Sequence, residues 1–321
     1  MVLHWRRFRA SRVNSDVADA NETIYSRVDA RVHRLLQRRP EVQDLDRHIK
    51  RLVAQAKHTK LADDWLLALI VQAPRAVLAQ IQMDRYPHGY RDKQTRLFEL
   101  IDFNDAFVST VLALPEEEHE RFADQTKEVC DNLCKEVGTP CFTNDQWESI
   151  VRGLSREIAL YLSAKNSGFQ VFMTSRAEDA LGIDMQIRDP DSKRYINVDC
   201  KTPSSFRYRL TVLVREGRLR ERDMIRAQRE YYAIETNGHS TAKAQIVLLC
   251  LHPDVYEMNG AFSFKNNETI RSELNRLIRD FGLSDNRFAA RDGDFLDTSH
   301  KKEGKPLPPK RKRLDFSSNT W

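Results

Sequence analysis

The chain of 321 residues is long enough for two domains of ordinary size. Charged residues make up 31% of it, the formal net charge is +5 and the pI is about 8.9, values that permit a nucleic-acid partner without requiring one. Its five cysteines are an odd number at irregular spacing. This excludes the disulfide framework of a small secreted domain and favours reduced thiols in the cytoplasm.

The first part of the chain contains no pattern typical of a targeting segment. Residues 1–12 are basic, but no long apolar stretch follows them, so we expect no secretory signal. The most apolar early window, residues 61–83, contains Asp63, Asp64 and Arg75. We therefore predict a buried helix, kinked or broken at Pro74, and no membrane partner.

Apolar residues at helical spacing dominate the chain up to about residue 142. The expected helices begin after prolines and have acidic residues in their first turns. The last of them ends near the segment Gly138-Thr139-Pro140. We predict an all-helical N-terminal domain over residues 1–142, which recognises substrate, forms a homodimer or binds a protein partner. Its predicted helices span residues 17–37, 41–57, 62–83, 94–114 and 116–137.

Strand-like segments first occur after residue 143, which predicts a mixed α/β domain over residues 143–290. The remaining residues, 291–321, are polar and basic, and we expect a disordered tail. Helices are predicted at 144–166, 219–236 and 267–281. Strands are predicted at 169–174, 182–187, 195–200 and 246–251, with a further short one at 262–264.

Two of these strands alternate polar and apolar residues and flank the turn signal Asp189-Pro190-Asp191-Ser192. In an antiparallel hairpin, opposed residues have a constant index sum. Placing Asp184 opposite Asp199 gives 184 + 199 = 383, and every apolar residue then faces an apolar one. A slip by two residues would keep the faces, so the alternation favours this register without fixing it.

The favoured register collects Asp184, Asp199 and Lys201 on the polar face of the hairpin. Two carboxylates about 5 Å apart repel each other unless a cation lies between them or one takes a proton. Mg²⁺ or Mn²⁺ suits such a pair, and a nearby lysine then orients or deprotonates an attacking water, or stabilises charge on a phosphate. The alternative is an exposed polar face that binds no metal.

The Asp184…Asp199-Cys200-Lys201 arrangement resembles the PD-(D/E)xK nuclease superfamily, which includes restriction endonucleases and RecB-like nucleases. Residues 147–251 match its order of a helix, a strand, a hairpin, a helix and a strand. Ile183 stands where proline is common, and Asp199 where glutamate is. The resemblance implies an α/β (α+β) restriction-endonuclease-like nuclease core beside the separate all-helical N-terminal domain.

The resemblance also implies further site residues. Glu157, on the helix before the first strand, would assist the metal site from nearby or as a ligand. Gln228 and Tyr232 match a Gln-x-x-x-Tyr element of RecB-like members and would share one helix face. Ordinary helical positions are the alternative for all three residues.

A basic segment follows the proposed metal site, and its arginines favour contact with a phosphate backbone. The alternative is a solvated helix face balanced by nearby acidic residues. The candidate nucleic-acid-binding residues are Arg207, Arg209, Arg222, Arg226 and Arg229.

These observations predict a nuclease that hydrolyses phosphodiester bonds in DNA, an endonuclease more readily than an exonuclease. An RNA endonuclease with the same site, or a catalytically silent nucleic-acid-binding relative, remains the alternative. The expected location is cytoplasmic. It becomes nuclear if the basic cluster at residues 310–313 (Lys-Arg-Lys-Arg) is an import signal rather than a tail that adds nonspecific affinity.

Overall fold

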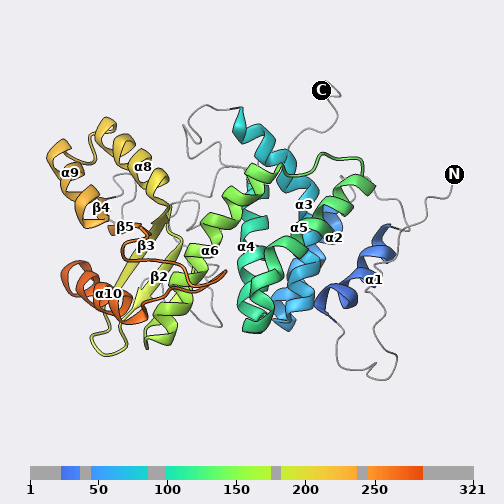
Figure 1. Ribbon diagram of the computed structural model, residues 1–321, viewed down its shortest axis with the longest axis horizontal. Coiled ribbons are helices and arrows are strands. Elements are labelled where there is room, and N and C mark those ends of the chain that lie inside the picture. The colour runs from blue at the N-terminus through green and yellow to red at the C-terminus, as the bar shows by residue number, and fades with distance from the viewer. Residues whose placement is uncertain (1–22, 37–44, 86–97, 175–181, 237–244, 285–321) are drawn as a thin grey trace, which may run out of the picture.

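The computed structural model describes residues 23–36, 45–85, 98–174, 182–236 and 245–284. The basic cluster at residues 310–313 and the predicted tail lie outside this part of the chain. The described residues form a helical region and a mixed helix–sheet region, which lie side by side with α6 between them (Figure 1).

Five α-helices and a short 3-10 helix form the helical region, close to the limits predicted from periodicity. α3 runs through Pro74 without interruption, so of the kink or break predicted at Pro74 the break is wrong. Among the described residues it is the one helix long and apolar enough to cross a membrane by length and composition, and most of it is buried inside the protein. The helices are α1 (Ile24–Leu36), α2 (Leu45–Thr59), α3 (Ala62–Asp84), α4 (Phe98–Ala113), η2 (Glu116–Glu118) and α5 (His119–Glu136).

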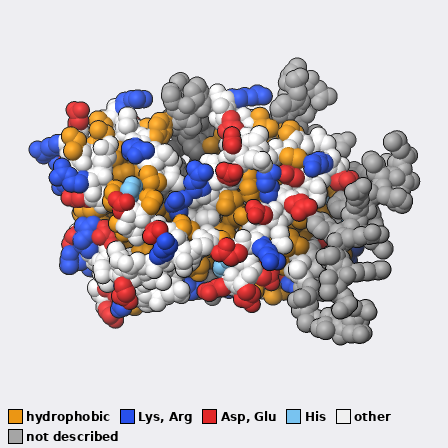
Figure 2. Space-filling model, viewed as in Figure 1, with side chains coloured by type: hydrophobic (Ala, Val, Ile, Leu, Met, Phe, Trp, Pro, Cys, Tyr) orange, Lys and Arg blue, Asp and Glu red, His pale blue; other side chains and the backbone are white. Residues whose placement is uncertain are grey.

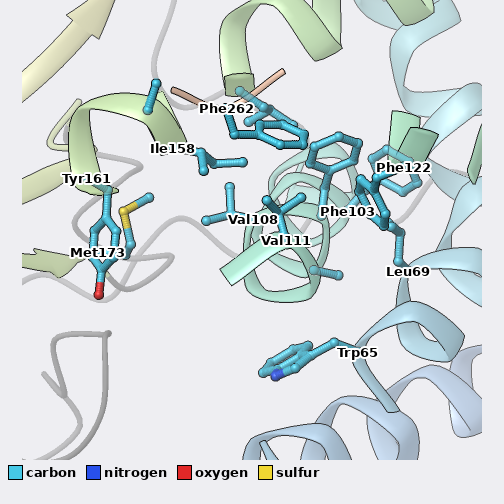
Figure 3. Close-up of a cluster of buried hydrophobic side chains, with 14 of the residues drawn as sticks. Trp65, Leu69, Phe103, Val108, Val111, Phe122, Ile158, Tyr161, Met173 and Phe262 are labelled. Carbon is cyan, nitrogen blue, oxygen red and sulfur yellow. The ribbon is translucent and has the colours of Figure 1, made fainter. Parts of the chain in front are cut away.

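α6 (Asn144–Asn166) begins at a capping box in which Thr143 Oγ1 accepts from the Gln146 backbone N–H and the Gln146 side chain accepts from Thr143 N–H. Its buried face packs against both regions. Trp147 lies edge-on to Phe103 and Phe107 of α4, with ring centroids 6.4 and 6.3 Å apart. Figure 3 shows Ile158 of α6 in the same cluster as side chains of α4. The predicted boundary at residue 143 thus falls where one continuous core joins the two regions.

The sheet has five strands in the order β1-β2-β3-β5-β4. β1, β2 and β3 form an antiparallel meander, β5 runs parallel to β3, and β4 pairs antiparallel with the outer side of β5. The described residues therefore form a mixed α+β structure. The strands are β1 (Gln170–Met173), β2 (Met185–Arg188), β3 (Tyr195–Lys201), β4 (Tyr232–Thr236) and β5 (Gln245–Cys250).

Helices cover both faces of the sheet. α6 and α10 (Asn267–Phe281) pack on the face that carries Met185, Ile187 and Val198. α8 (Pro203–Arg215) and α9 (Glu221–Glu230) cover the other face, where Phe206 and Leu248 belong to a second core cluster. β5 is buried on both sides, as its unbroken apolar sequence predicts.

Three details of the sheet region differ from the predictions. The predicted helix over residues 219–236 ends at Glu230, and the chain becomes β4 two residues later. α8 was not predicted. Phe262 to Phe264 forms no named strand, since only the bridge between Met258 and Phe264 is present.

Candidate active site

The hairpin of β2 and β3 has the register predicted from the polar and apolar alternation. Met185 pairs with Val198 and Ile187 with Ile196, both with an index sum of 383. The turn is closed by Asp189, whose carboxylate accepts from the backbone N–H groups of Asp191 and Ser192 at 3.1 and 3.2 Å. Because the pleat has a period of two, Asn197, Asp199 and Lys201 share the face opposite to Val198.

Asp184 lies one residue before β2, where the regular pairing stops. Its backbone N–H donates to Val198 O at 2.8 Å rather than to Asp199, and its carbonyl oxygen accepts from Thr174 N at 3.1 Å. Its carboxylate Oδ2 accepts from Cys200 N at 2.7 Å. The ladder therefore does not include Asp184 opposite Asp199, but main-chain bonds to β3 and to the end of β1 fix Asp184 in place.

The side chains of Asp184, Asp199 and Lys201 nevertheless converge. Lys201 Nζ donates to Asp199 Oδ1 and to the Cys200 carbonyl oxygen, and it lies 3.9 Å from Asp184 Oδ2. The ammonium group thus occupies the position beside both carboxylates at which a cation is needed. The described structure brings together the three residues on which the sequence interpretation rested.

Burial dominates the electrostatics of this group. Asp199 is only 4% exposed. Burial raises its pKa from 3.8 to about 7, with a contribution from the Asp184 carboxylate and against the opposing effect of Lys201. For Lys201, burial alone favours the neutral amine, but Asp199 and Asp184 outweigh it and raise the pKa of the ammonium. The polar face of the hairpin is therefore largely buried, and the exposure expected in the metal-free alternative is wrong.

A hard divalent ion binds through one or two carboxylates together with water and phosphate oxygens. Asp184 and Asp199 fit that donor set, because their carboxylates approach one ammonium group from just before β2 and from β3. Within the ranges that the structure describes, no three His, Cys, Asp or Glu side chains gather closely enough to hold a single ion. Any metal centre here would therefore depend on the two aspartates.

Glu157 lies half-buried on α6, the helix that packs on the other face of the sheet. Burial raises the pKa of the Cys200 thiol, and the charges of Asp184 and Glu157 add to that rise. Glu157 is thus a neighbour of the same strand end. It does not join the two aspartates in a three-residue ligand group, so its metal role stays a prediction.

The predicted pairing of Gln228 with Tyr232 on one helix face is wrong. Gln228 is exposed on α9, whereas Tyr232 is the first residue of β4. The ring of Tyr232 packs against Phe281, with centroids 5.5 Å apart, and lies under the Arg276 guanidinium at 4.8 Å. These contacts are on the α10 side of the sheet, opposite to the face of Asp199. The helix stops because Tyr231 adopts a left-handed conformation.

One of the five predicted phosphate-binding arginines also has a different role. Arg209 Nη2 donates to Glu235 Oε1 at 2.6 Å, and Arg218 binds the same carboxylate. Glu235 is 2% exposed on β4, so Arg209 is turned inward to a buried partner. The remaining four, Arg207, Arg222, Arg226 and Arg229, are exposed on α8 and α9.

Figure 2 shows Lys and Arg side chains gathered at the end of the molecule where α9 and α10 lie in Figure 1. Arg222 and Arg226 have side chains 71% and 65% exposed, and their contacts with Asp223 and Glu230 are long, at 4.0 and 3.7 Å. Such pairs are weak at a solvated surface. These guanidinium groups therefore remain accessible to an anionic partner.

Sequence reasoning missed two features beside the site. Thr174 fastens the Asp184 backbone and carries no motif that identifies it. Arg156, next to Glu157 on α6, is partly buried beside Arg152, and the pKa of its guanidinium is lowered by burial and by that second charge. In the described part of the chain its Nε has no hydrogen-bond partner. An arginine adjacent to a candidate glutamate was the signal available in the sequence.

Comparisons with protein-family models, with curated proteins and with solved structures find no match to this chain.

Proposed function

We propose that this protein is a divalent-metal-dependent nuclease that hydrolyses phosphodiester bonds in DNA. The observation that carries the proposal is the convergence of Asp184, Asp199 and Lys201 at the end of the β2–β3 hairpin. They lie on the face of the sheet that is covered by α8 and α9, the two helices that carry the exposed arginines. A purely structural ion pair needs one acid and one base. Here a second carboxylate is held beside the pair by a main-chain hydrogen bond.

The surrounding order of elements supports the same proposal. A helix bearing Glu157 precedes the meander, and a connection that contains α8, α9 and the edge strand β4 leads from β3 to the parallel strand β5. This order resembles the PD-(D/E)xK core, in which the acids and the lysine lie on the central hairpin. The nuclease core fold is therefore part of the proposal.

Each residue has a role that follows from its chemistry. Asp184 and Asp199 would hold Mg²⁺ or Mn²⁺, and a bound divalent ion stabilises negative charge on phosphate oxygens. The raised pKa of Lys201 keeps it charged at neutral pH. It therefore serves to orient an attacking water and to stabilise the charge that develops on the phosphate, rather than to accept a proton.

The test is a cleavage assay on plasmid, linear and single-stranded DNA and on RNA, with Mg²⁺ or Mn²⁺ and with EDTA. Asp199→Ala and Lys201→Ala should each abolish metal-dependent cleavage. Asp131→Ala is a matched control, because Asp131 forms a 2.7 Å ion pair with Lys127 on α5, away from the sheet. Undiminished cleavage by both site variants would falsify the proposal, and cleavage of RNA alone would indicate the RNA endonuclease instead.

A further inference from the structure

An aromatic cluster lies where α9 passes into β4 and β5 ends. The rings of Tyr231 and His252 are stacked, with centroids 4.3 Å apart and planes 7° from parallel. Tyr231 OH donates to Asp254 Oδ2 at 2.7 Å, and His252 Nδ1 accepts from the Asp254 backbone N–H at 3.3 Å. One aspartate thus holds both rings in a fixed orientation, while 30% of the His252 side chain stays exposed.

The backbone at Tyr231 makes this arrangement unusual. Tyr231 has φ 60° and ψ 20°, a left-handed conformation that a bulky residue rarely adopts. Glycine normally fills such a helix end, because it has no Cβ to clash. A tyrosine kept there at a conformational cost indicates that its ring has a use at this position.

The stacked pair adjoins the proposed catalytic residues. Cys250 is the register partner of Lys201 on the parallel strand, and the next residue, Leu251, donates its N–H to Lys201 O at 2.9 Å. His252 follows directly. The pair therefore lies at the same strand ends as Lys201, on the side covered by α8, whose core cluster Tyr231 contacts.

Two arginines influence the end of β5, because burial raises the pKa of the Cys250 thiol and the charges of Arg207 and Arg156 oppose that rise. Arg207 belongs to α8, on the side of the stacked pair, whereas Arg156 belongs to α6, which packs on the other face of the sheet. Arg207 is exposed on α8. Cationic groups beside a stacked aromatic face are the combination that binds single-stranded nucleic acids, through phosphates and base rings respectively.

We propose that Tyr231 and His252 form a stacking platform for an unpaired nucleobase of the substrate, next to the phosphate that Lys201 faces. The position of the base relative to the phosphate beside Lys201 rests on the proposed function. The inference adds to that function the class of substrate. A base inside a regular duplex is stacked on its neighbours and offers no free ring face. The platform therefore selects single-stranded nucleic acid, or a duplex with an unpaired nucleotide.

The experiment measures binding of the full-length protein in EDTA, so that metal-dependent cleavage does not occur. Fluorescence anisotropy compares a short labelled DNA strand, the RNA strand of the same sequence, the DNA strand with abasic sites and the duplex. The abasic strand keeps the phosphates and removes the rings. Because alanine substitution at a stacking position weakens binding about fivefold or more per base, the wild type should bind the intact strand at least about fivefold more tightly than the abasic one.

Variants assign that preference to the cluster. His252→Ala should reduce the ratio between intact and abasic strands to about twofold or less, whereas His252→Phe keeps a ring and should preserve it. Tyr231→Phe retains the ring but removes the hydroxyl. It measures how far the ratio between intact and abasic strands depends on the hydrogen bond from Tyr231 to Asp254. His58→Ala, at an exposed position on α2, is the matched control and should leave the ratio unchanged. Circular dichroism establishes that each variant is folded.

The inference fails if the wild type shows no preference for the intact strand, or if His252→Ala keeps the preference. Either result can occur while Asp199→Ala still abolishes cleavage, so the proposed function would survive. Conversely, a His252-dependent preference in a protein that cleaves no nucleic acid would support the platform and overturn the nuclease. A preference shared by the DNA and RNA strands supports the platform for both sugars.

Discussion

The carboxylate of Asp184 accepts a 2.7 Å hydrogen bond from the backbone N–H of Cys200, so the first aspartate is fastened to the strand that carries the second. Asp199 and Lys201 flank Cys200 in the sequence, and their side chains share the face of β3 opposite to that of the Cys200 side chain. The bond therefore helps to set the spacing of the two carboxylates. It also explains why regular strand pairing is not needed at Asp184.

The raised pKa of Asp199 makes metal binding depend on pH. Between about pH 4 and pH 7 the folded protein keeps a proton on Asp199 that the unfolded chain has lost, so this group's contribution to stability falls as the pH rises. A metal ion needs the deprotonated carboxylate. We expect Mg²⁺ to raise the melting temperature more at pH 8 than at pH 6, as measured by differential scanning calorimetry.

Asp199→Asn should lose most of that Mg²⁺-induced rise at pH 8, whereas Asp131→Asn should keep it. An equal rise at pH 6 and pH 8 in the wild type would contradict the assignment of Asp199 as the titrating ligand.

The buried carboxylate of Glu235 should contribute strongly to stability. Glu235→Ala leaves the guanidinium groups of Arg209 and Arg218 without this buried partner, and breaking such a group costs about 3–5 kcal/mol. Urea unfolding measures the loss. Glu257→Ala is the control, because its pair with Lys265 is more than half exposed and should contribute at most about 1 kcal/mol. Similar losses in the two variants would refute the structural role of Glu235.

Arg209 and Arg222 should behave differently although both follow Lys201 in the sequence. Arg222→Ala removes an exposed charge. It should reduce by about one the slope of the logarithm of the DNA-binding constant against the logarithm of the salt concentration, and it should leave the free energy of unfolding unchanged. Arg209→Ala should instead lower the free energy of unfolding, because Glu235 loses a partner. Binding titrations at several salt concentrations, together with urea unfolding, separate the two effects. A reduced slope for Arg209→Ala in a fully stable protein would contradict its inward orientation.

The packing between the helical region and the sheet region predicts that they unfold together. Phe107 of α4 contacts Trp147 of α6 and also Phe262, with centroids 6.3 Å apart in both cases. Phe107→Ala should cost about 3–5 kcal/mol and destabilise both regions. Hydrogen exchange followed by mass spectrometry measures protection in α3 and in β5 separately, with Leu61→Ala, at a 59% exposed site, as the control. Loss of protection in α3 alone would show that the regions are independent.

The sequence by itself determined the elements whose signals are local. Helical periodicity predicted most helices, and α10 has the bounds that were expected. Alternation with a period of two, with the turn at Asp189, predicted the pairing of Met185 with Val198, because a slip by one residue would expose the apolar face. A slip by two residues also fitted the alternation, and only the structure decided between these registers. The predicted register was sufficient to bring Asp199 and Lys201 to one face beside Asp184.

Only the tertiary structure decided what surrounds that face. The parallel pairing of β3 with β5 and the covering of the polar side by α8 depend on residues that are distant in the chain. The same holds for the helix end at Tyr231, since the ring is held by His252 and Asp254, more than twenty residues later. Predictions from local propensity do not include these contacts. They therefore extended the helix expected over residues 219–236 through Tyr232, and they placed Arg209 at the surface. Contacts of this kind decide burial, and burial decides whether a charged side chain binds a partner within the fold or remains available to a ligand.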